Sequence, residues 1–133
     1  MKTIIEEGPI KLKVPKAEKI SRKMSVFYNP VMGLNRDISV LLLNSINKED
    51  MQIADPLAAS GVRSIRLLKE LSKNKIKCIC INDSNKNAVK SIKENLKLNK
   101  INYKINNKIK ISNEDANLFL LNSSGFDYID IDP

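Results

Sequence analysis

The sequence of 133 residues contains no histidine and no tryptophan, and it has only two cysteines and four glycines. Without histidine, the chain cannot by itself form a Ser-His-Asp or Cys-His catalytic arrangement. No apolar run approaches the roughly 20 residues that a membrane-spanning helix needs, and the N-terminus lacks the long apolar core of a signal peptide. We therefore expect a cytoplasmic protein that makes no contact with a membrane.

The two cysteines, Cys78 and Cys80, lie two positions apart within an apolar run. In a strand, this spacing puts both side chains on the same face, where the geometry disfavours a disulfide between them. A structural zinc site needs four ligands, so this pair alone does not form one. We interpret both residues as small buried apolar side chains and predict no metal site.

Basic residues outnumber acidic ones by 23 to 15, which gives a formal net charge of +8. Such a balance favours a polyanionic partner such as nucleic acid. Lysine, asparagine and isoleucine are abundant along the whole chain, however, and a coding bias explains the charge equally well. The charge alone therefore says little about the partner.

The first 34 residues differ from the rest, and we interpret them as an N-terminal extension. Residues 10–14 alternate apolar and basic side chains, residues 7–9 form a turn signal, and residues 3–5 can supply a partner strand. This pattern is typical of a β-hairpin. A basic stretch and an aromatic segment that ends at Asn29-Pro30 complete the extension; the basic residues are Lys16, Lys19, Arg22 and Lys23.

From residue 35 to residue 133, helical and strand patterns alternate. The helical spacing, which in the first segment places Ile38, Leu41 and Leu42 on one side, covers residues 36–43, 62–71, 86–98 and 116–121. Strands are predicted at residues 52–55, 77–82, 108–112 and 126–131. Alternation of this kind predicts a parallel sheet with right-handed crossovers. The predicted fold class is therefore α/β and Rossmann-like, with a hairpin extension.

Each predicted strand is followed by an aspartate, and the four are Asp55, Asp83, Asp115 and Asp132. Ligands of open α/β sheets bind beyond the carboxyl ends of the strands. A single aspartate there would be interpreted as a turn former, but four at equivalent positions indicate a ligand site.

The connection after the first of these strands has the sequence D-P-L-A-A-S-G-V-R, from Asp55 to Arg63. Its small residues allow a ligand to approach the backbone, and the helix that begins near Gly61 points amide groups at that ligand. Gly61 is its only glycine, so the G-x-G-x-x-G pattern of pyrophosphate binding is absent. The loop instead fits a ligand with a carboxylate and an ammonium group, such as the methionine part of S-adenosylmethionine.

The later acids suit the remaining parts of such a ligand. Asp83 lies 22 residues after Gly61, where an acid accepts hydrogen bonds from ribose hydroxyls in related sites. Asp115-Ala116 would lie beside the adenine, and Asp115 can also cap a helix. Asp132-Pro133 follows the last strand, where a carboxylate can accept a hydrogen bond from a base amine and direct the nitrogen lone pair at a methyl donor. Without the other acids, Asp132 would be interpreted as a turn residue.

Taken together, these segments resemble the tRNA guanine-26 N2-dimethyltransferase family of archaea and eukaryotes. The resemblance rests on residues 7–8, 14–16, 26–32, 35–39, 55–66, 82–83, 114–117 and 130–133. It implies a class I S-adenosylmethionine-dependent methyltransferase core, with S-adenosylmethionine as cofactor and tRNA as substrate and partner.

The resemblance also implies roles for individual residues. The cofactor would be contacted by Arg36, Arg63, Asp83, Asp115 and Ala116, while Asp55, Ser60 and Gly61 shape the loop. Asp132 would hold the guanine amine, and Phe27 would stack on the flipped-out base. Two alternatives stay open: Phe27 can instead anchor the extension to the core, and Arg36 can pair with Asp37 or with a strand-end acid.

The sequence departs from the family in two places. Pro56 stands where the family has alanine, and the sequence ends at Asp132-Pro133 where the family continues with three further strands and a tRNA-binding domain. We therefore expect an incomplete sheet of order 3-2-1-4, completed by a C-terminal segment or a second chain. The rival functions are a non-catalytic module that binds S-adenosylmethionine or RNA in a divided enzyme, an amino-methyltransferase for another RNA, and a nucleotide-dependent oxidoreductase of the same fold.

Overall fold

The structure, a computed structural model, describes residues 1–16 and 25–132. Three of the basic residues of the extension, Lys19, Arg22 and Lys23, and also Pro133 lie outside the described residues. The chain opens with an antiparallel hairpin of β1 (Lys2–Glu7) and β2 (Ile10–Pro15), in which Glu7 pairs with Ile10. The hairpin expected from the alternating pattern is therefore confirmed.

A four-stranded sheet of order β5-β4-β3-β6 forms the centre of the molecule. Its strands are β3 (Met51–Asp55), β4 (Ile76–Asn82), β5 (Ile109–Ser112) and β6 (Tyr128–Ile129), and all neighbours are parallel. This order confirms the predicted 3-2-1-4 arrangement. Strand β6 is shorter than predicted, although Asp127 and Asp130 donate backbone hydrogen bonds to the carbonyls of Gln52 and Ala54 on either side of it.

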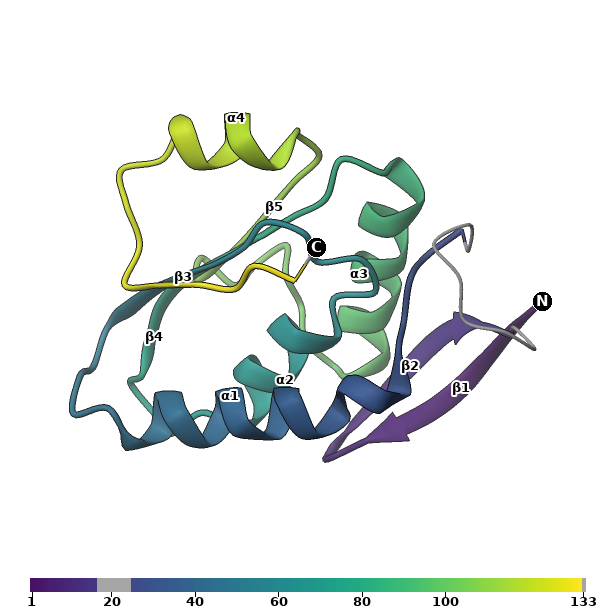
Figure 1. The fold of residues 1–133 in the computed structure, drawn as a ribbon, viewed down its shortest axis with the longest axis horizontal. Coiled ribbons are helices and arrows are strands. Elements are labelled where there is room, and N and C mark those ends of the chain that lie inside the picture. Colours follow the sequence, from purple (N-terminus) through teal and green to yellow (C-terminus); the bar gives the residue numbers. More distant parts are fainter. Residues whose placement is uncertain (17–24, 133) are drawn as a thin grey trace.

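The helices cover the sheet on both faces. They are α1 (Gly33–Ser45), which follows the short 3₁₀ helix η1 (Pro30–Met32), and α2 (Val62–Glu70), α3 (Lys86–Leu98) and α4 (Ala116–Leu121). Figure 1 shows α1, α2 and α3 on one side of the sheet and α4 on the other. The side chain of Asn85 caps α3, and that of Asp115 caps α4. Because parallel strands all end at one edge, the loops after them meet there.

The hairpin belongs to the same apolar core as the sheet. Its alternate residues Ile10, Leu12 and Val14 are buried together with sheet and helix residues such as Ile53 and Ile79. Burial of one face of β2 follows from its period-two pattern. The hairpin is thereby fixed against the core domain.

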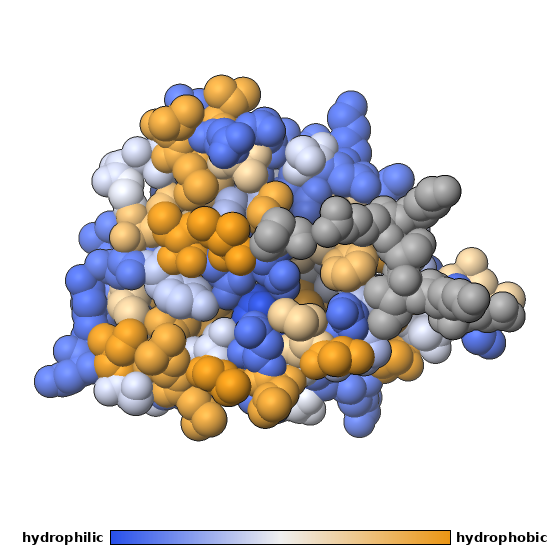
Figure 2. Space-filling view, in the orientation of Figure 1, coloured by the Kyte–Doolittle hydropathy of each residue, from blue (hydrophilic) through white to orange (hydrophobic). Residues whose placement is uncertain are grey.

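Helix α1 is longer than predicted, and its apolar side faces outward. Ile38, Leu41 and Leu42 are 56%, 69% and 51% exposed, whereas Arg36 and Leu43 are buried. Figure 2 shows this apolar surface over α1, with further apolar surface above it. No described helix is long and apolar enough to cross a membrane.

Cys78 and Cys80 are free, and their sulfur atoms lie 3.7 Å apart on one face of β4. Their expected shared face and the absence of a disulfide are confirmed. Both side chains are only partly buried, so the prediction that they are buried was wrong. Burial and the neighbouring Cys78 raise the pKa of Cys80 to about 11, so its thiol stays protonated at neutral pH. Among the described residues no group of three or more acids or cysteines is placed to hold a metal ion.

Candidate functional site

A cavity of about 320 Å³ opens at the carboxyl edge of the sheet, at the lower end of the range for small-molecule sites. Seven of the residues that the sequence singled out line it: Phe27, Arg36, Asp55, Ser60, Arg63, Asp83 and Asp132. Gly61, Asp115 and Ala116 are not among its lining residues. Three of the four strand-end acids thus meet in one cavity, whereas Asp115, which was predicted to join them, does not line it.

Asp55, the last residue of β3, is a buried residue of the cavity wall. It is 4% exposed, and its Oδ2 accepts a 2.6 Å hydrogen bond from Ser64 Oγ on α2. Burial raises the pKa of Asp55 to about 7, the charge of Asp130 adds to the rise, and the hydrogen bond from Ser64 opposes it. Asp55 therefore connects the strand to the helix and titrates near neutral pH.

The turn into α2 depends on Gly61. Its φ is +78°, which L side chains rarely adopt, and a Cβ there would lie 3.2 Å from Ile92 Cγ1. The helix starts at the next residue. Val62 and Arg63, which carry the first backbone amides of α2, both line the cavity. Such amides form a site for an anionic group. Gly61 thus allows the tight turn of the loop beside Ile92, and it does not line the cavity.

Ser60 lines the cavity and has a buried hydroxyl without a hydrogen-bond partner among the described residues. Its side chain is 1% exposed, and Ser60 Oγ has no hydrogen-bond partner in the described part of the chain. Buried hydroxyls are almost always hydrogen-bonded. The residue lines the cavity, so a ligand there is the natural partner for its hydroxyl.

Asp83 follows β4 and contacts the opposite loop. Its Oδ2 accepts from the backbone N–H of Ala59 at 2.9 Å, and its Oδ1 accepts from the N–H of Asn85 at the same distance. A carboxylate has about four acceptor positions, so Asp83 retains capacity for ligand hydroxyls. These two bonds fix its orientation towards the cavity.

Asn82, which the sequence reasoning did not single out, holds the strand ends together. Its buried side chain donates to the carbonyls of Pro56 and Glu114 and accepts from Ser112 Oγ at 2.7 Å. It therefore bonds to the loops that follow β3 and β5. The signal available in the sequence was a polar residue at the end of an otherwise apolar strand.

Asp115 and Ala116 begin α4 beyond β5. Asp115 Oδ1 accepts from the N–H groups of Asn117 and Leu118, so Asp115 caps α4 as the sequence predicted. This capping role is compatible with contact to a cofactor. Its side chain is exposed at the same edge of the sheet as the cavity. Contact of either residue with a ligand stays a prediction.

Arg63, in the first turn of α2, joins the residues that follow β6 to α1. Its guanidinium bonds to Asp130 at 2.9 Å, Asp132 at 3.3 Å, and Asn35 and Ser39 on α1, both at 2.9 Å. Asp132 remains 42% exposed at the cavity. Arg63 thus positions Asp132, the acid that the sequence analysis expects to hold the guanine amine.

Asp130 is the buried partner in this arrangement, although the sequence reasoning gave it no separate role. Tyr128 Oη donates to Asp130 Oδ2 at 2.8 Å. Burial raises the pKa of Asp130, while the bond from Tyr128 and the charge of Arg63 oppose the rise. The D-x-D spacing at the strand end was its signal, since alternate residues share one side of a strand.

Phe27 lies on the cavity wall between two anchored neighbours. Val26 and Tyr28 are 5% and 8% exposed, whereas Phe27 is 39% exposed and lines the cavity. Val26 and Tyr28 therefore attach this segment to the core and leave the Phe27 side chain partly exposed at the cavity. A flat apolar ligand group can stack there.

Arg36 occupies a buried position on α1 beside the hairpin. It is 4% exposed and pairs with Glu7 through Nε at 2.8 Å and Nη2 at 2.5 Å, while Nη2 also donates to the carbonyl of Asn29. Its guanidinium carbon lies 5.3 Å from the centroid of the Tyr28 ring. The alternative pairing of Arg36 with Asp37 is not observed, because Asp37 pairs with Arg66 instead.

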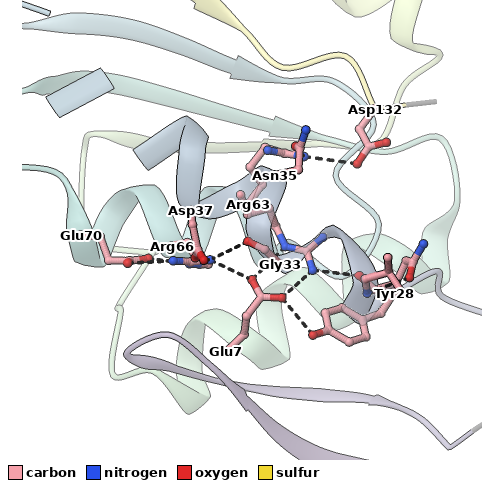
Figure 3. A network of polar contacts seen from close by, with 12 residues as sticks. Glu7, Tyr28, Gly33, Asn35, Asp37, Arg63, Arg66, Glu70 and Asp132 are labelled. Atoms are coloured by element: carbon pink, nitrogen blue, oxygen red, sulfur yellow. Dashed lines mark hydrogen bonds and ion pairs between the residues drawn. The ribbon is translucent and has the colours of Figure 1, made fainter. Parts of the chain in front are cut away.

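Glu7 is the centre of a polar network that the sequence reasoning missed (Figure 3). Its carboxylate accepts from Arg36, from Tyr28 Oη at 3.0 Å and from Arg66 Nη1 at 3.3 Å. Burial alone would raise the pKa of Glu7, but the bonds and charge of Arg36 hold it below its usual value. Burial, together with the charge of Glu7, raises the pKa of Tyr28 to about 12.

Comparison with known proteins agrees with this geometry. Residues 8–133 match the family model described as N2,N2-dimethylguanosine tRNA methyltransferase. The chain belongs to this family. A curated relative from Methanococcus maripaludis, named tRNA (guanine(26)-N(2))-dimethyltransferase, is 44% identical over 135 residues, which cover 98% of this chain and 35% of the relative.

Two further comparisons bear on the family and the fold. An Aquifex aeolicus relative named tRNA (guanine(26)-N(2)/guanine(27)-N(2))-dimethyltransferase is 42% identical over 98% of this chain and 33% of its own length. The structure of Trm1 from Pyrococcus horikoshii with S-adenosyl-L-methionine superposes with a TM-score of 0.78 at 33% identity, covering 98% of this chain and 36% of that one. The chain therefore spans about a third of the length of these relatives, and the predicted family and Rossmann-like fold are confirmed.

Proposed function

We propose that this chain is the cofactor-binding part of a tRNA guanine-N2 methyltransferase, with guanine 26 as the target base. The observation that supports this most is the meeting of Asp55, Asp83 and Asp132 in one cavity, with an aromatic wall at Phe27. Membership of the N2,N2-dimethylguanosine tRNA methyltransferase family supplies the reaction. The division into an extension at 1–34 and a partial methyltransferase domain at 35–133 is part of the same proposal.

The donor set of the cavity fits S-adenosylmethionine. Arg36 and the first amides of α2 suit its carboxylate, and Asp83 suits the ribose hydroxyls. Arg63 faces the same cavity, Ser60 offers its unused hydroxyl, and Asp115 and Ala116 would bind on the adenine side. When bound, this cofactor supplies a methyl group on a sulfonium, which is a good leaving group.

Asp132 and Phe27 form the side of the cavity that would receive the base. The exocyclic amine of guanine is a poor nucleophile, because its lone pair is delocalised into the ring. The Asp132 carboxylate, held by Arg63 at 3.3 Å, would accept a hydrogen bond from that amine and direct the lone pair at the methyl group. Phe27 would stack on the extruded base, and the nitrogen loses its proton once the new bond has formed.

The partner of this chain would cover α1 and β6. The apolar side of α1 is exposed, and so are Ile129 and Ile131 at the open edge of the sheet. The relatives are about three times as long as the matched region, and a further segment of that length is the occupant that we propose. The cytoplasmic location expected from the sequence follows from a tRNA substrate and stays a prediction.

Methyl transfer from labelled S-adenosylmethionine to tRNA transcripts tests this function in the full-length protein. We expect labelling of a transcript with guanine at position 26 and none of a transcript with adenine there. Equal labelling of both transcripts would favour an amino-methyltransferase that acts elsewhere on RNA. Binding of S-adenosylhomocysteine with no transfer to any RNA would favour the rival reading as a non-catalytic binding module.

A further inference from the structure

None of the described hairpin residues, Glu7 included, lines the cavity. What connects the two is Arg36, which lines the cavity and pairs with Glu7 across 29 positions of sequence. The inference below rests on the proposed function, since it concerns how the cofactor carboxylate is held.

The pairing of Glu7 with Arg36 fixes the plane of the guanidinium. Nε and Nη2 of Arg36 donate to the two carboxylate oxygens of Glu7, and Nη2 also donates to the carbonyl of Asn29. A two-point contact of this kind restricts both position and orientation. No carboxylate or carbonyl of residues 1–16 and 25–132 accepts from Nη1 of Arg36, and Arg36 lines the cavity.

Glu7 is itself held rigidly from several directions. Tyr28 Oη and Arg66 Nη1 donate to its oxygens, and its side chain is only 11% exposed. The next residue, Gly8, has a φ of +54°, and a Cβ there would lie 3.1 Å from Arg66 Nη2. The turn of the hairpin is therefore pressed against Arg66, which also bonds to Glu70 at 2.6 Å.

We propose that Glu7 is a positioning residue for cofactor binding: it orients Arg36 so that Nη1 is left to bind the carboxylate of S-adenosylmethionine. Arg36 has no other acidic partner among the described residues. A buried guanidinium without a carboxylate partner is unfavourable and rearranges towards any acid within reach. In the absence of Glu7, Arg36 would turn towards Asp132, which lines the same cavity.

The test uses Glu7→Gln in the full-length protein, with Glu70→Gln as the matched control. Glu70 is a partly buried acid of the same network, but it bonds to Arg66 and not to Arg36. We expect Glu7→Gln to raise the KM for S-adenosylmethionine at least tenfold, with kcat and the KM for tRNA changed less than threefold. We expect Glu70→Gln to leave all three values within twofold of the wild type.

A double variant separates positioning from general damage to the fold. If Glu7 acts through Arg36, then Glu7→Gln added to Arg36→Gln causes no further loss of S-adenosylhomocysteine affinity beyond that of Arg36→Gln alone. Glu7→Asp keeps the charge on a shorter side chain and should give an intermediate affinity, which serves as the readout if Glu7→Gln does not fold. Wild-type affinity in folded Glu7→Gln and Glu7→Asp, or equal losses in Glu7→Gln and Glu70→Gln, would overturn the inference.

The same titrations distinguish this inference from the proposed function. A wild-type protein that is folded and binds no S-adenosylhomocysteine would overturn both. A wild-type protein that binds it normally while Glu7→Gln also binds normally would overturn the positioning role alone.

Discussion

Asp55 shows how one buried carboxyl couples the site to pH. Its pKa is about 7 in the folded protein and 3.8 in its ordinary state. Between these values the folded protein holds a proton that the unfolded chain has released. The contribution of Asp55 to stability is therefore complete below about pH 4 and is lost as pH rises to 7.

Asp55→Asn should remove this pH dependence. We expect the free energy of unfolding of the wild type, relative to that of the variant, to fall by on the order of 2–4 kcal/mol between pH 4 and pH 7.5. Urea unfolding of both proteins at several pH values measures this difference. Parallel stability profiles of the two proteins would show that Asp55 is ionised throughout.

Asp132 is the residue whose loss should affect chemistry and not cofactor binding. We expect Asp132→Asn to lower kcat by roughly 10²–10⁴-fold, with the affinity for S-adenosylhomocysteine changed less than threefold. Asp127→Asn is the matched control, because Asp127 precedes the same strand and pairs with Lys48 away from the cavity. Equal activity of the two variants would remove Asp132 from the mechanism.

Among individual residues, the sequence could identify those whose positions follow from the fold class alone. Asp55, Asp83 and Asp132 end parallel strands, so their convergence was predictable from element order. Glu7 and Asn82 act through partners far away in sequence, such as Arg36 and Glu114. A local pattern can mark Asn82 as a polar residue at a strand end, but it does not report partners so far away, so neither pairing could be predicted from the sequence.

Helix α3 connects the hairpin to the loop between β3 and α2. Asn95 accepts from the N–H of Lys13 at 2.7 Å and donates to the carbonyl of Ser60 at 2.9 Å. One turn later, Asn99 bonds to both the N–H and the carbonyl of Lys11. These side-chain amides therefore bind the backbone N–H and carbonyl groups of β2, which would otherwise need a neighbouring strand as partner.

Asn95→Ala should destabilise this connection, since it leaves a partly buried backbone N–H of β2 and the buried carbonyl of Ser60 without partners. We expect the free energy of unfolding to fall by roughly 1–3 kcal/mol. Asn87→Ala, on the exposed first turn of the same helix, should change it by less than about 0.5 kcal/mol. Chemical denaturation measures both, and similar small effects would mean that the hairpin does not depend on Asn95.

The elements differ in how well their patterns predicted them. Helices α3 and α4 have the predicted bounds, because capping residues mark their starts at Asn85 and Asp115. The pattern of α1 identified an apolar side but could not tell which side is buried. Arg36 turns inward because Glu7, from a distant hairpin, neutralises its charge.

The molecule as a whole leaves α1 and the β6 edge apolar and open. Leu41 is 69% exposed in this chain, yet the proposed further segment would bury it. Leu41→Asp in the full-length protein should therefore lower the free energy of unfolding by on the order of 1–3 kcal/mol. Lys69→Asp, on the exposed side of α2, is the control, and an equally small effect of both substitutions would show that nothing covers α1.

Whether the cavity binds the S-adenosyl cofactor, as S-adenosylmethionine or as its thioether product S-adenosylhomocysteine, tests the account most directly. Calorimetric titration of the full-length protein with S-adenosylhomocysteine, and separately with NAD, gives the answer. We expect one binding site for S-adenosylhomocysteine, a loss of at least tenfold in affinity in Asp83→Ala, and no binding of NAD. Binding of NAD in the absence of any binding of S-adenosylhomocysteine would contradict the account and favour the oxidoreductase reading.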